Sequence, residues 1–259
     1  MPRTDYEGWM ATAYDAGRAL TPAAVTTWRD AATPFLDGDD AGRVLDLGSG
    51  TGRFSALLAE WACGTVVAVE PALAMARQAK DKEQADVDVV NGRAESIPLR
   101  DHSVRAAWLS NVIHHVDDLD TAASQLGRVL QRGGRVLLRG ALGIEGMTRP
   151  GSADARILQY FPSALKYARA FPGRRRVLDA FGRARFSEEA TVTVAQVTAP
   201  SLRSFSERIR TRANSVLAQL DDDDFAAGLA ALERDAALEA SPQPVVDHLD
   251  LVVLRAGAD

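Results

Sequence analysis

Hydrophobic and polar positions follow two periods along the chain. After the polar residues 37–40, short apolar runs rich in Val and Leu alternate with segments whose apolar residues recur at helical spacing. This alternation is typical of a parallel sheet whose strands are connected by helices. It predicts strands at residues 43–47, 65–70, 86–91, 106–110 and 135–140, and helices near residues 52–62, 72–83 and 119–131. Five such strands are enough for a doubly wound α/β sheet.

The pattern changes on both sides of this region. Residues 6–32 are predicted to form one or two amphipathic helices that break at Thr21-Pro22, because Thr can cap a helix and Pro can start one. From residue 142 to 185 the alternation stops, and aromatic-rich helical segments predict an insertion. Two late strands, at residues 190–198 and 245–255, flank a helical stretch at residues 202–238.

The length of 259 residues suits one large α/β domain. We expect residues 1–259 to form a single domain with four parts. These are an N-terminal helical lid at residues 1–40, a ligand-binding core at 41–142, a helical insertion at 143–189, and C-terminal strands and helices at 190–259.

Composition and charge exclude several functions. Hydrophobic residues make up 46% and charged residues 25%, which are ordinary globular proportions. The formal net charge of −5 gives no basic field that would attract a phosphate backbone, so nucleic acid is not an expected partner. The basic run at residues 174–176 is interpreted as a solvated turn rather than a docking patch.

The single cysteine, Cys63, allows no intramolecular disulfide and no cysteine-based metal cluster, which fits a reducing compartment. Residues 1–8 contain Asp5 and Glu7 in place of a basic and then apolar leader. No segment approaches the roughly 18 apolar residues of a membrane span. We expect a cytoplasmic protein with no membrane partner.

A glycine-rich turn gives the strongest chemical signal. Residues 44–52 read VLDLGSGTG, in which a strand ends in a turn that leads directly into the helix predicted at residues 53–59. Glycines allow the backbone to approach a ligand closely, and a helix start presents unpaired N–H groups. A nucleotide-like ligand is indicated, although tight turns also use glycine for conformational reasons alone.

Two acids refine this interpretation. The second strand ends in Glu70, 22 residues after Gly48, where a carboxylate is expected to meet ribose hydroxyls. A dinucleotide fold uses G-x-G-x-x-G, but here the third glycine, Gly52, comes one residue early. Asp46 would repel a pyrophosphate, whereas it suits a ligand with a cationic ammonium or sulfonium group. NAD is therefore the second choice.

Five segments in this order resemble the class I, Rossmann-like S-adenosylmethionine-dependent methyltransferases, in particular the broad group that acts on small molecules and lipids. The segments are residues 44–55, 68–71, 94–99, 110–116 and 128–130 with Gly133-Gly134. The resemblance covers roughly residues 40–140. It implies a doubly wound, mostly parallel seven-stranded sheet with an antiparallel last strand, N-terminal helices and a helical insertion that forms a lid.

The resemblance also implies a site for S-adenosylmethionine along the ends of the first four strands. Asp46 orients the loop, whose residues Gly48, Ser49 and Gly50 approach the methionine half of the cofactor. Glu70 holds the ribose, and Pro71 flanks the adenine. Ala94, through its backbone, and Glu95 lie beside the adenine, and Asn111 lies beneath the cofactor. These implied ligand residues lie at or after the carboxyl ends of predicted strands.

Two N-terminal residues are further candidates. Tyr14 and Arg18 are four residues apart and therefore share one face of a helix. There the Arg18 guanidinium is a candidate to hold the cofactor carboxylate. The alternative is a solvent-facing pair on an amphipathic helix.

His114 and His115 follow the fourth strand, at the edge where ligands bind in open α/β sheets. An imidazole suits a general base, and we expect His114 to face the substrate while at least one of the pair packs or hydrogen bonds to backbone. A metal site formed with Asp117 and Asp118 is not expected, because adjacent residues point in different directions and no further ligand is spaced to join them.

The expected function is methyl transfer to a small-molecule acceptor. Aromatic residues in the insertion and the N-terminal helices favour an apolar or aromatic acceptor, although such stripes are more often core. They are Tyr160, Phe161, Tyr167, Phe171, Phe181, Tyr6, Trp9 and Trp28. Two alternatives remain, a cofactor-binding module without catalysis and an NAD-dependent oxidoreductase.

Overall fold

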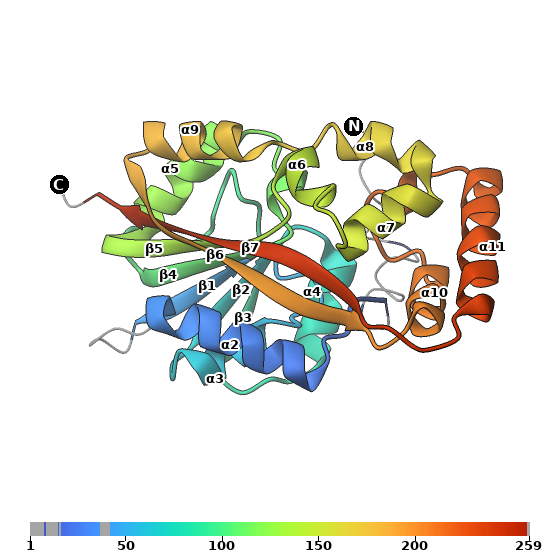
Figure 1. Ribbon diagram of the computed structural model, residues 1–259. Coiled ribbons are helices and arrows are strands. Elements are labelled where there is room, and N and C mark those ends of the chain that lie inside the picture. Colours follow the sequence, from blue (N-terminus) through green and yellow to red (C-terminus); the bar gives the residue numbers. More distant parts are fainter. Residues whose placement is uncertain (1–7, 9–14, 16, 37–41, 258–259) are drawn as a thin grey trace. The chain divides into compact units, whose positions relative to one another are not determined.

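The structure, a computed structural model, describes residues 8, 15, 17–36 and 42–257 of the chain. Its strands form one seven-stranded sheet in the order β3-β2-β1-β4-β5-β7-β6 (Figure 1). The strands are β1 (Arg43–Leu47), β2 (Val66–Glu70), β3 (Val87–Asn91), β4 (Val104–Ser110), β5 (Leu130–Gly140), β6 (Phe186–Ala199) and β7 (Val245–Ala256).

Strand direction confirms the predicted fold class. β1 pairs in parallel with both β2 and β4, β2 pairs in parallel with β3, and β4 with β5. The last strand, β7, pairs antiparallel with β5. The order of the sheet reverses between β1 and β4, and in open α/β sheets ligands bind at such a reversal, outside the carboxyl ends of the strands.

Helices connect the strands as the periodicity predicts. In Figure 1, α3 lies below the strands, and α5 and α9 lie above them. The α-helices are α2 (Pro22–Leu36), α3 (Ser55–Trp61), α4 (Leu73–Asp81), α5 (Leu119–Val129), α6 (Gly143–Met147), α7 (Ala153–Tyr160), α8 (Leu165–Ala168), α9 (Arg174–Arg183), α10 (Leu202–Arg210) and α11 (Asp222–Leu238). Short 3-10 helices are η1 (Ile113–His115), η2 (Pro162–Ala164) and η3 (Leu217–Gln219).

The chain divides into two compact units. The core unit consists of residues 29–140, 172–192 and 250–259, and the helical unit consists of residues 1–28, 141–171 and 193–249. None of the helices in the described part of the chain is long and apolar enough to cross a membrane.

The core unit is organised around strands that are buried on both faces. β2 is buried along its whole length, and β1 is buried from its second residue onward. Continuous apolar runs of this kind are expected where helices cover both faces of a parallel sheet. On the side of α3, Trp108 packs against Phe54 and Trp61, with ring centroids 5.2 and 6.4 Å away. This packing fixes α3, and thus the end of the loop before it, against β4.

The helical unit has an apolar core of its own. Phe161, 2% exposed, stacks on Phe225 of α11 with ring centroids 5.6 Å apart. Trp28 is fully buried, and its Nε1 donates a hydrogen bond to Gln196 at 2.8 Å. Not all aromatic residues of the insertion are part of this core, because Phe181 packs on Phe186 in the core unit.

Several element boundaries differ from the prediction. α3 begins at Ser55 rather than near residue 52, because Gly52 has a φ of +75°, outside the right-handed helical region. α2 begins at Pro22 as predicted but continues to Leu36, past the predicted end at residue 32. Before α2 the structure describes only residues 8, 15 and 17–21, so the aromatic residues Tyr6 and Trp9 lie outside the described residues.

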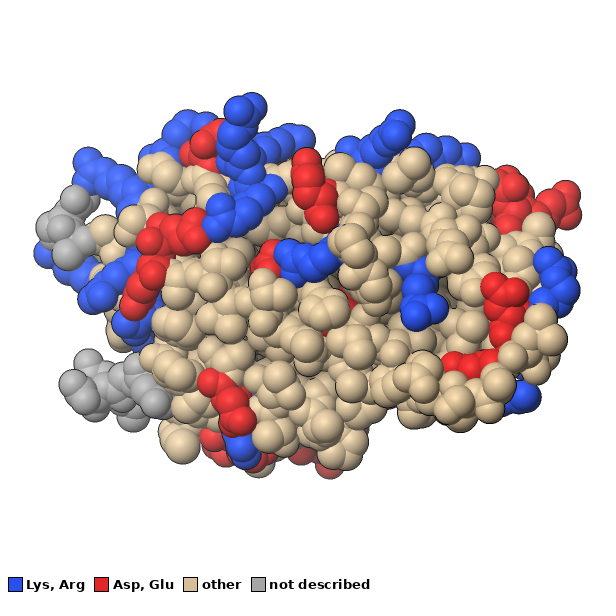
Figure 2. Space-filling view, viewed as in Figure 1, with Lys and Arg blue, Asp and Glu red and all other residues tan. Residues whose placement is uncertain are grey.

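The basic run at residues 174–176 forms the first turn of α9 and not a turn between elements, so that prediction is wrong. Arg174 pairs with Glu188 at 2.5 Å, and Arg183 at the other end of α9 pairs with Asp120 at 2.7 Å. Figure 2 shows Lys and Arg side chains gathered over α9, with acidic side chains between them. Half-exposed pairs of this kind contribute little to stability.

Two helical glycines give opposite predictions for stability. A Cβ at Gly228 of α11 would lie 2.4 Å from Phe161 Cδ1 and 2.7 Å from the Tyr160 carbonyl oxygen, whereas a Cβ at Gly182 of α9 would meet no atom within 4 Å. We expect Gly228→Ala to lose about 1–3 kcal/mol by overpacking. Gly182→Ala should gain about 0.5–1 kcal/mol through lower chain entropy in the unfolded state. Urea unfolding of both variants measures this, and equal signs would contradict the described packing of α11.

Candidate functional site

The glycine loop after β1 adopts a conformation that requires its glycines. Gly48, Gly50 and Gly52 have φ values of +70°, +58° and +75°. Side chains are strained in this left-handed region. The N–H of Gly48 donates to the Val69 carbonyl of β2 at 2.8 Å, and a Cβ on Gly48 would lie only 2.4 Å from Val112, which follows β4. The loop is therefore held between the two strands that flank β1.

Glu70 joins this loop to the start of α4. Its carboxylate is 6% exposed, with Oε2 accepting the N–H of Gly50 at 2.8 Å and Oε1 accepting the N–H of Ala72 at 2.9 Å. A carboxylate has about four lone-pair positions, so both oxygens can still accept hydrogen bonds from a ligand. The structure places Glu70 beside the loop as the sequence predicts, and adds that it shapes the loop.

Asn91, at the end of β3, is a contributor that the sequence analysis missed. It pairs in register with Glu70, and its Nδ2 donates to the carbonyl oxygens of Glu70 at 2.9 Å and Pro71 at 3.0 Å. Asn91 thus fixes the backbone on which the acid and the predicted adenine neighbour Pro71 are carried. A polar residue closing an apolar strand was the available signal.

Asp46 is a buried acid whose ionisation is unfavourable. It is 2% exposed, and its Oδ2 accepts a hydrogen bond from Ser55 Oγ at 2.7 Å. Burial raises the pKa of Asp46 to about 7 and outweighs the hydrogen bond from Ser55, which lowers it; the nearby charge of Glu70 also raises this pKa, and Arg53 lowers it. Because Ser55 is the first residue of α3, this bond connects the end of β1 to the helix across the glycine loop.

Asn111 follows β4 in a strained conformation. Its φ is +55°, its N–H donates to the Arg139 carbonyl at 2.8 Å, and its Oδ1 is 2.7 Å from where a Cβ on Gly140 would lie. Asn tolerates the left-handed region better than most residues, and such strain clusters at functional sites. The residue therefore lies at the expected edge of the sheet, tight against the end of β5.

The two candidate histidines lie on η1, the short helix that follows. Their ring centroids are 4.0 Å apart with planes inclined by 48°. His114 is half-buried and His115 is exposed. Among the other histidines, His102 has its Nδ1 2.8 Å from the Leu130 carbonyl, a contact of structural type. The structure places both candidate histidines side by side after β4, and the choice of His114 as the general base stays a prediction.

The acids after the histidines are engaged in local structure. Asp118 caps α5 by accepting hydrogen bonds from the N–H groups of Asp120 and Thr121, and the Thr121 contacts hold the pKa of Asp118 below its usual value. Asp117 forms an ion pair with Arg93, with Oδ2 and Nη2 3.1 Å apart. Among the described residues no group of three or more His, Cys, Asp or Glu side chains is placed to hold a metal ion.

The predicted adenine-side residues lie in the connection after β3. Ala94 is buried, at 8% exposure. The Glu95 Oε1 accepts the N–H of Asp117 at 2.9 Å, so its carboxylate is directed at the segment after β4. Of the N-terminal candidates, Tyr14 lies outside the described residues, and the Arg18 Nε donates to the Ala213 carbonyl at 2.8 Å within the helical unit.

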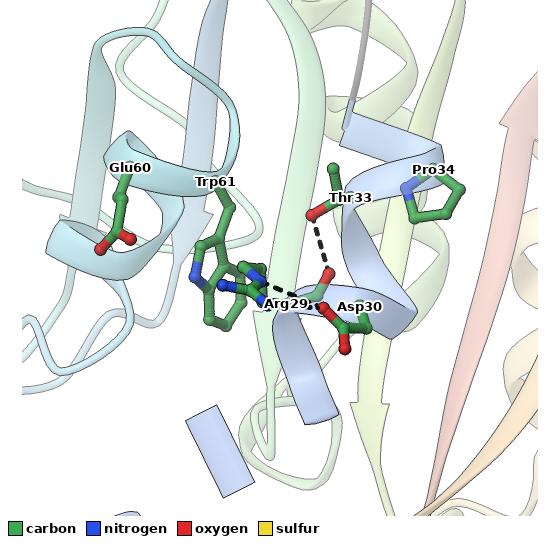
Figure 3. Close-up of a pocket in the computed structure, with 6 residues that line it drawn as sticks. All are labelled: Arg29, Asp30, Thr33, Pro34, Glu60 and Trp61. Atoms are coloured by element: carbon green, nitrogen blue, oxygen red, sulfur yellow. Dashed lines mark hydrogen bonds and ion pairs between the residues drawn. The ribbon is translucent and has the colours of Figure 1, made fainter. Parts of the chain in front are cut away.

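A surface groove of about 560 Å³ lies elsewhere in the core unit, between α2 and the far end of α3 (Figure 3). It is lined by Arg29, Asp30, Thr33, Pro34, Glu60 and Trp61. Arg29 pairs with its neighbour Asp30 at 3.0 Å, and the Thr33 hydroxyl donates to the Arg29 carbonyl at 2.8 Å. The groove is at the opposite end of α3 from the glycine loop, so it is not part of the site above.

Comparison with known proteins now identifies the domain. Residues 45–138 match a family described as a methyltransferase domain. Over 124 residues the chain is 37% identical to an uncharacterised methyltransferase of Mycobacterium tuberculosis, covering 48% of this chain and 47% of that protein. Over 111 residues it is 34% identical to a demethylmenaquinone methyltransferase of Streptomyces avermitilis, covering 43% and 47%. The chain thus spans about half the length of the curated relatives it matches.

The fold is shared with solved structures. A protein of Anabaena variabilis, provisionally described as a methyltransferase from an antibiotic biosynthesis pathway, aligns with a TM-score of 0.69 and 20% identity, covering 91% of this chain and all of that one. The region that matches the methyltransferase family, residues 45–138, runs from β1 to β5. It contains the glycine loop, both buried acids, Asn111 and the two candidate histidines. This confirms the resemblance seen in the sequence: the chain carries, at residues 45–138, the methyltransferase domain of the class I S-adenosylmethionine-dependent enzymes.

Proposed function

We propose that the protein transfers a methyl group from S-adenosylmethionine to a small-molecule acceptor. The observation that carries the proposal is the pair of buried acids at neighbouring strand ends. Asp46 and Glu70 are 2% and 6% exposed; Glu70 accepts the N–H of Gly50 within the glycine loop, and Asp46 accepts a hydrogen bond from Ser55, which follows the loop. A cationic, ribose-bearing ligand complements this arrangement.

The donor set fits the cofactor in two respects. A cation near Asp46 offsets the cost of its buried charge, which burial and Glu70 make unfavourable. Glu70 retains acceptor capacity for ribose hydroxyls on the oxygens that hold Gly50 and Ala72. The same acids would repel a pyrophosphate, which favours S-adenosylmethionine over NAD.

When bound, the cofactor would supply an electrophilic methyl group on a sulfonium, which the acceptor's nucleophile takes in line while S-adenosylhomocysteine leaves with the electron pair of the broken carbon–sulfur bond. The protein's contribution is placement and proton removal. Placement alone supplies up to about 7–11 kcal/mol of the barrier in well-oriented reactions. The loop at Gly48 and Gly50 and the acid Glu70 hold the cofactor, and Asn111 supports it from the end of β4. His114 accepts the proton that the acceptor loses, the role in which a positioned imidazole contributes about 10²–10⁴-fold.

We propose an apolar or aromatic acceptor. The Streptomyces relative is named for demethylmenaquinone, which is such a molecule. The chain's net charge of −5 also favours a small acceptor over nucleic acid. Demethylmenaquinone is therefore the first acceptor to test.

Calorimetric titration tests cofactor binding and the part played by Glu70. The wild-type protein should bind S-adenosylhomocysteine at micromolar concentration and should not bind NAD. In Glu70→Gln only one side-chain oxygen remains, so an amide N–H faces either the Gly50 or the Ala72 N–H. We expect a loss of about 1.5–3 kcal/mol in binding, roughly a 10- to 150-fold rise in Kd, together with lower thermal stability. The exposed Glu60→Gln is the matched control.

Wild-type affinity in Glu70→Gln would contradict the site. Binding of NAD alone would support the oxidoreductase alternative, and binding of S-adenosylhomocysteine without turnover on any acceptor would support a non-catalytic module.

Asp46 should make stability depend on pH near neutrality. Its pKa is about 7 in the folded protein against 3.8 ordinarily, so the folded state binds the proton more tightly than the unfolded state. The stability contributed by protonated Asp46 is complete below about pH 4 and is lost as pH rises through 7, a change of up to about 4 kcal/mol. Asp46→Asn, which still accepts from Ser55, should remove this slope. Unfolding free energies at pH 5 and pH 8 measure it, and parallel profiles for the two proteins would refute the assignment.

His114 is tested by separating binding from turnover. His114→Ala should keep wild-type affinity for S-adenosylhomocysteine and slow methyl transfer to reduced demethylmenaquinone by about 10²–10⁴-fold. His115→Ala is the neighbouring control and should retain most activity. A wild-type rate in His114→Ala, measured by release of S-adenosylhomocysteine, would show that another group accepts the proton.

A further inference from the structure

Two side-chain bridges connect the loop after β3 with the segment after β4. Glu95 Oε1 accepts the backbone N–H of Asp117 at 2.9 Å, and Arg93 Nη2 lies 3.1 Å from Asp117 Oδ2. Arg93 Nε is also 3.6 Å from Glu95 Oε2, so the three residues form one network. We refer to these contacts as the 93–95–117 bridge.

The two ends of this bridge carry different parts of the candidate site. On one side, Arg93 and Glu95 flank Ala94, the buried residue expected beside the adenine. On the other side, Asp117 closes the irregular segment that begins at the strained Asn111 and contains His114. The bridge thus spans from the predicted cofactor contact to the predicted base, although those residues are 20 positions apart in the sequence.

We infer that Arg93, Glu95 and Asp117 are positioning residues that make the placement of His114 depend on cofactor occupancy. The inference rests on the proposed function. A ligand that settles the backbone around Ala94 also settles Glu95, whose carboxylate holds the N–H of Asp117. The short helix η1, which carries His114, then adopts one conformation when the cofactor is bound. Cofactor binding and the position of His114 are thereby coupled.

The contacts on either side of residues 111–117 explain why this segment would respond to cofactor binding. Beyond Ala94 the connection is fixed to α5, because Arg128 Nη2 and Nη1 donate to the carbonyls of Ile97 and Leu99 at 2.8 and 2.7 Å. α5 itself starts at the Asp118 cap. Residues 111–117 therefore run between two fixed points, the end of β4 and the start of α5, and the bridge meets them just before the second.

Because the side chains of the 93–95–117 bridge are partly exposed, an effect on the position of His114 can be measured apart from an effect on folding. The side chains of Arg93 and Asp117 are 50% and 63% exposed, and that of Glu95 is 19% exposed. Ion pairs as exposed as that of Arg93 with Asp117 contribute little to stability and are screened by salt. Removing Arg93 should leave the fold intact, with a melting temperature within about 2 °C of wild type.

Histidine NMR provides a readout that needs no acceptor. The chain has four histidines, so the ring resonances of protein labelled at histidine can be assigned from His114→Gln and similar single variants. S-adenosylhomocysteine is titrated into wild type, Arg93→Met and the control Arg100→Met. Arg100 lies in the same connection, is exposed, and its side chain makes no hydrogen bond or ion pair within the described part of the chain.

We expect saturating S-adenosylhomocysteine to shift the His114 ring resonances in wild type and Arg100→Met. In Arg93→Met the shift should fall to half or less while Kd changes by no more than about threefold. The charge-reversed pair Arg93→Asp with Asp117→Arg should recover most of the shift, and 0.5 M salt should reduce the wild-type shift.

A full His114 shift in Arg93→Met, or no His114 shift in wild type that binds the ligand, would overturn this inference and leave the proposed function standing. Absence of S-adenosylhomocysteine binding by wild type would overturn both.

Discussion

The buried carboxylate of Glu70 is the constraint on which the site depends. One oxygen holds the glycine loop through Gly50, and the other holds the start of α4 through Ala72. Both segments leave the sheet at the carboxyl ends of adjacent strands, so a single group fixes the separation between them. A buried carboxylate needs donors around it, and the loop offers its N–H groups only in the left-handed conformation that its glycines permit. The acid and the glycines therefore require each other.

The same group sets the electrostatics of its neighbour. Glu70 adds to the effect of burial on Asp46, and together they raise the pKa of Asp46 into the neutral range. Ser55 and Arg53 offset only part of this cost. The folded, ligand-free site thus carries two acids where one ionises reluctantly, and a cationic ligand relieves the repulsion. In the proposed function, this one arrangement favours a sulfonium and repels a pyrophosphate.

The sequence predicts the parallel core well because its strands are continuous apolar runs with polar ends. It places the start of β5 five residues late, since Gly133-Gly134 looks like a turn. In the structure the strand runs through them, and its register with β4 shifts from Val104–Leu130 to Ala106–Arg135 around these glycines, as in a bulge. The start of β6 is also missed, because the exposed residues 187–189 of this last strand in the sheet order are polar, as in a loop.

Some residues of the candidate site could likewise be predicted from the sequence, and others could not. Gly48, Asp46 and Glu70 are foreseeable because a motif spaces them, whereas Asn91 and Ser55 act on partners that only the folded backbone brings near. Glu95 shows the limit most clearly, since the resemblance implies a cofactor contact whereas the structure gives its carboxylate a protein partner, the N–H of Asp117.

The aromatic residues of the insertion differ in how far their rings are buried. A ring recognises an acceptor only where it stays accessible, and Phe161 and Phe181, at 2% and 1% exposure, are used by two separate cores. Tyr167 and Phe171 remain half-buried at the edge of the helical unit's core. The number of aromatic residues in the insertion is therefore a poor guide to the acceptor, because the rings that fill these two cores are not free to contact it.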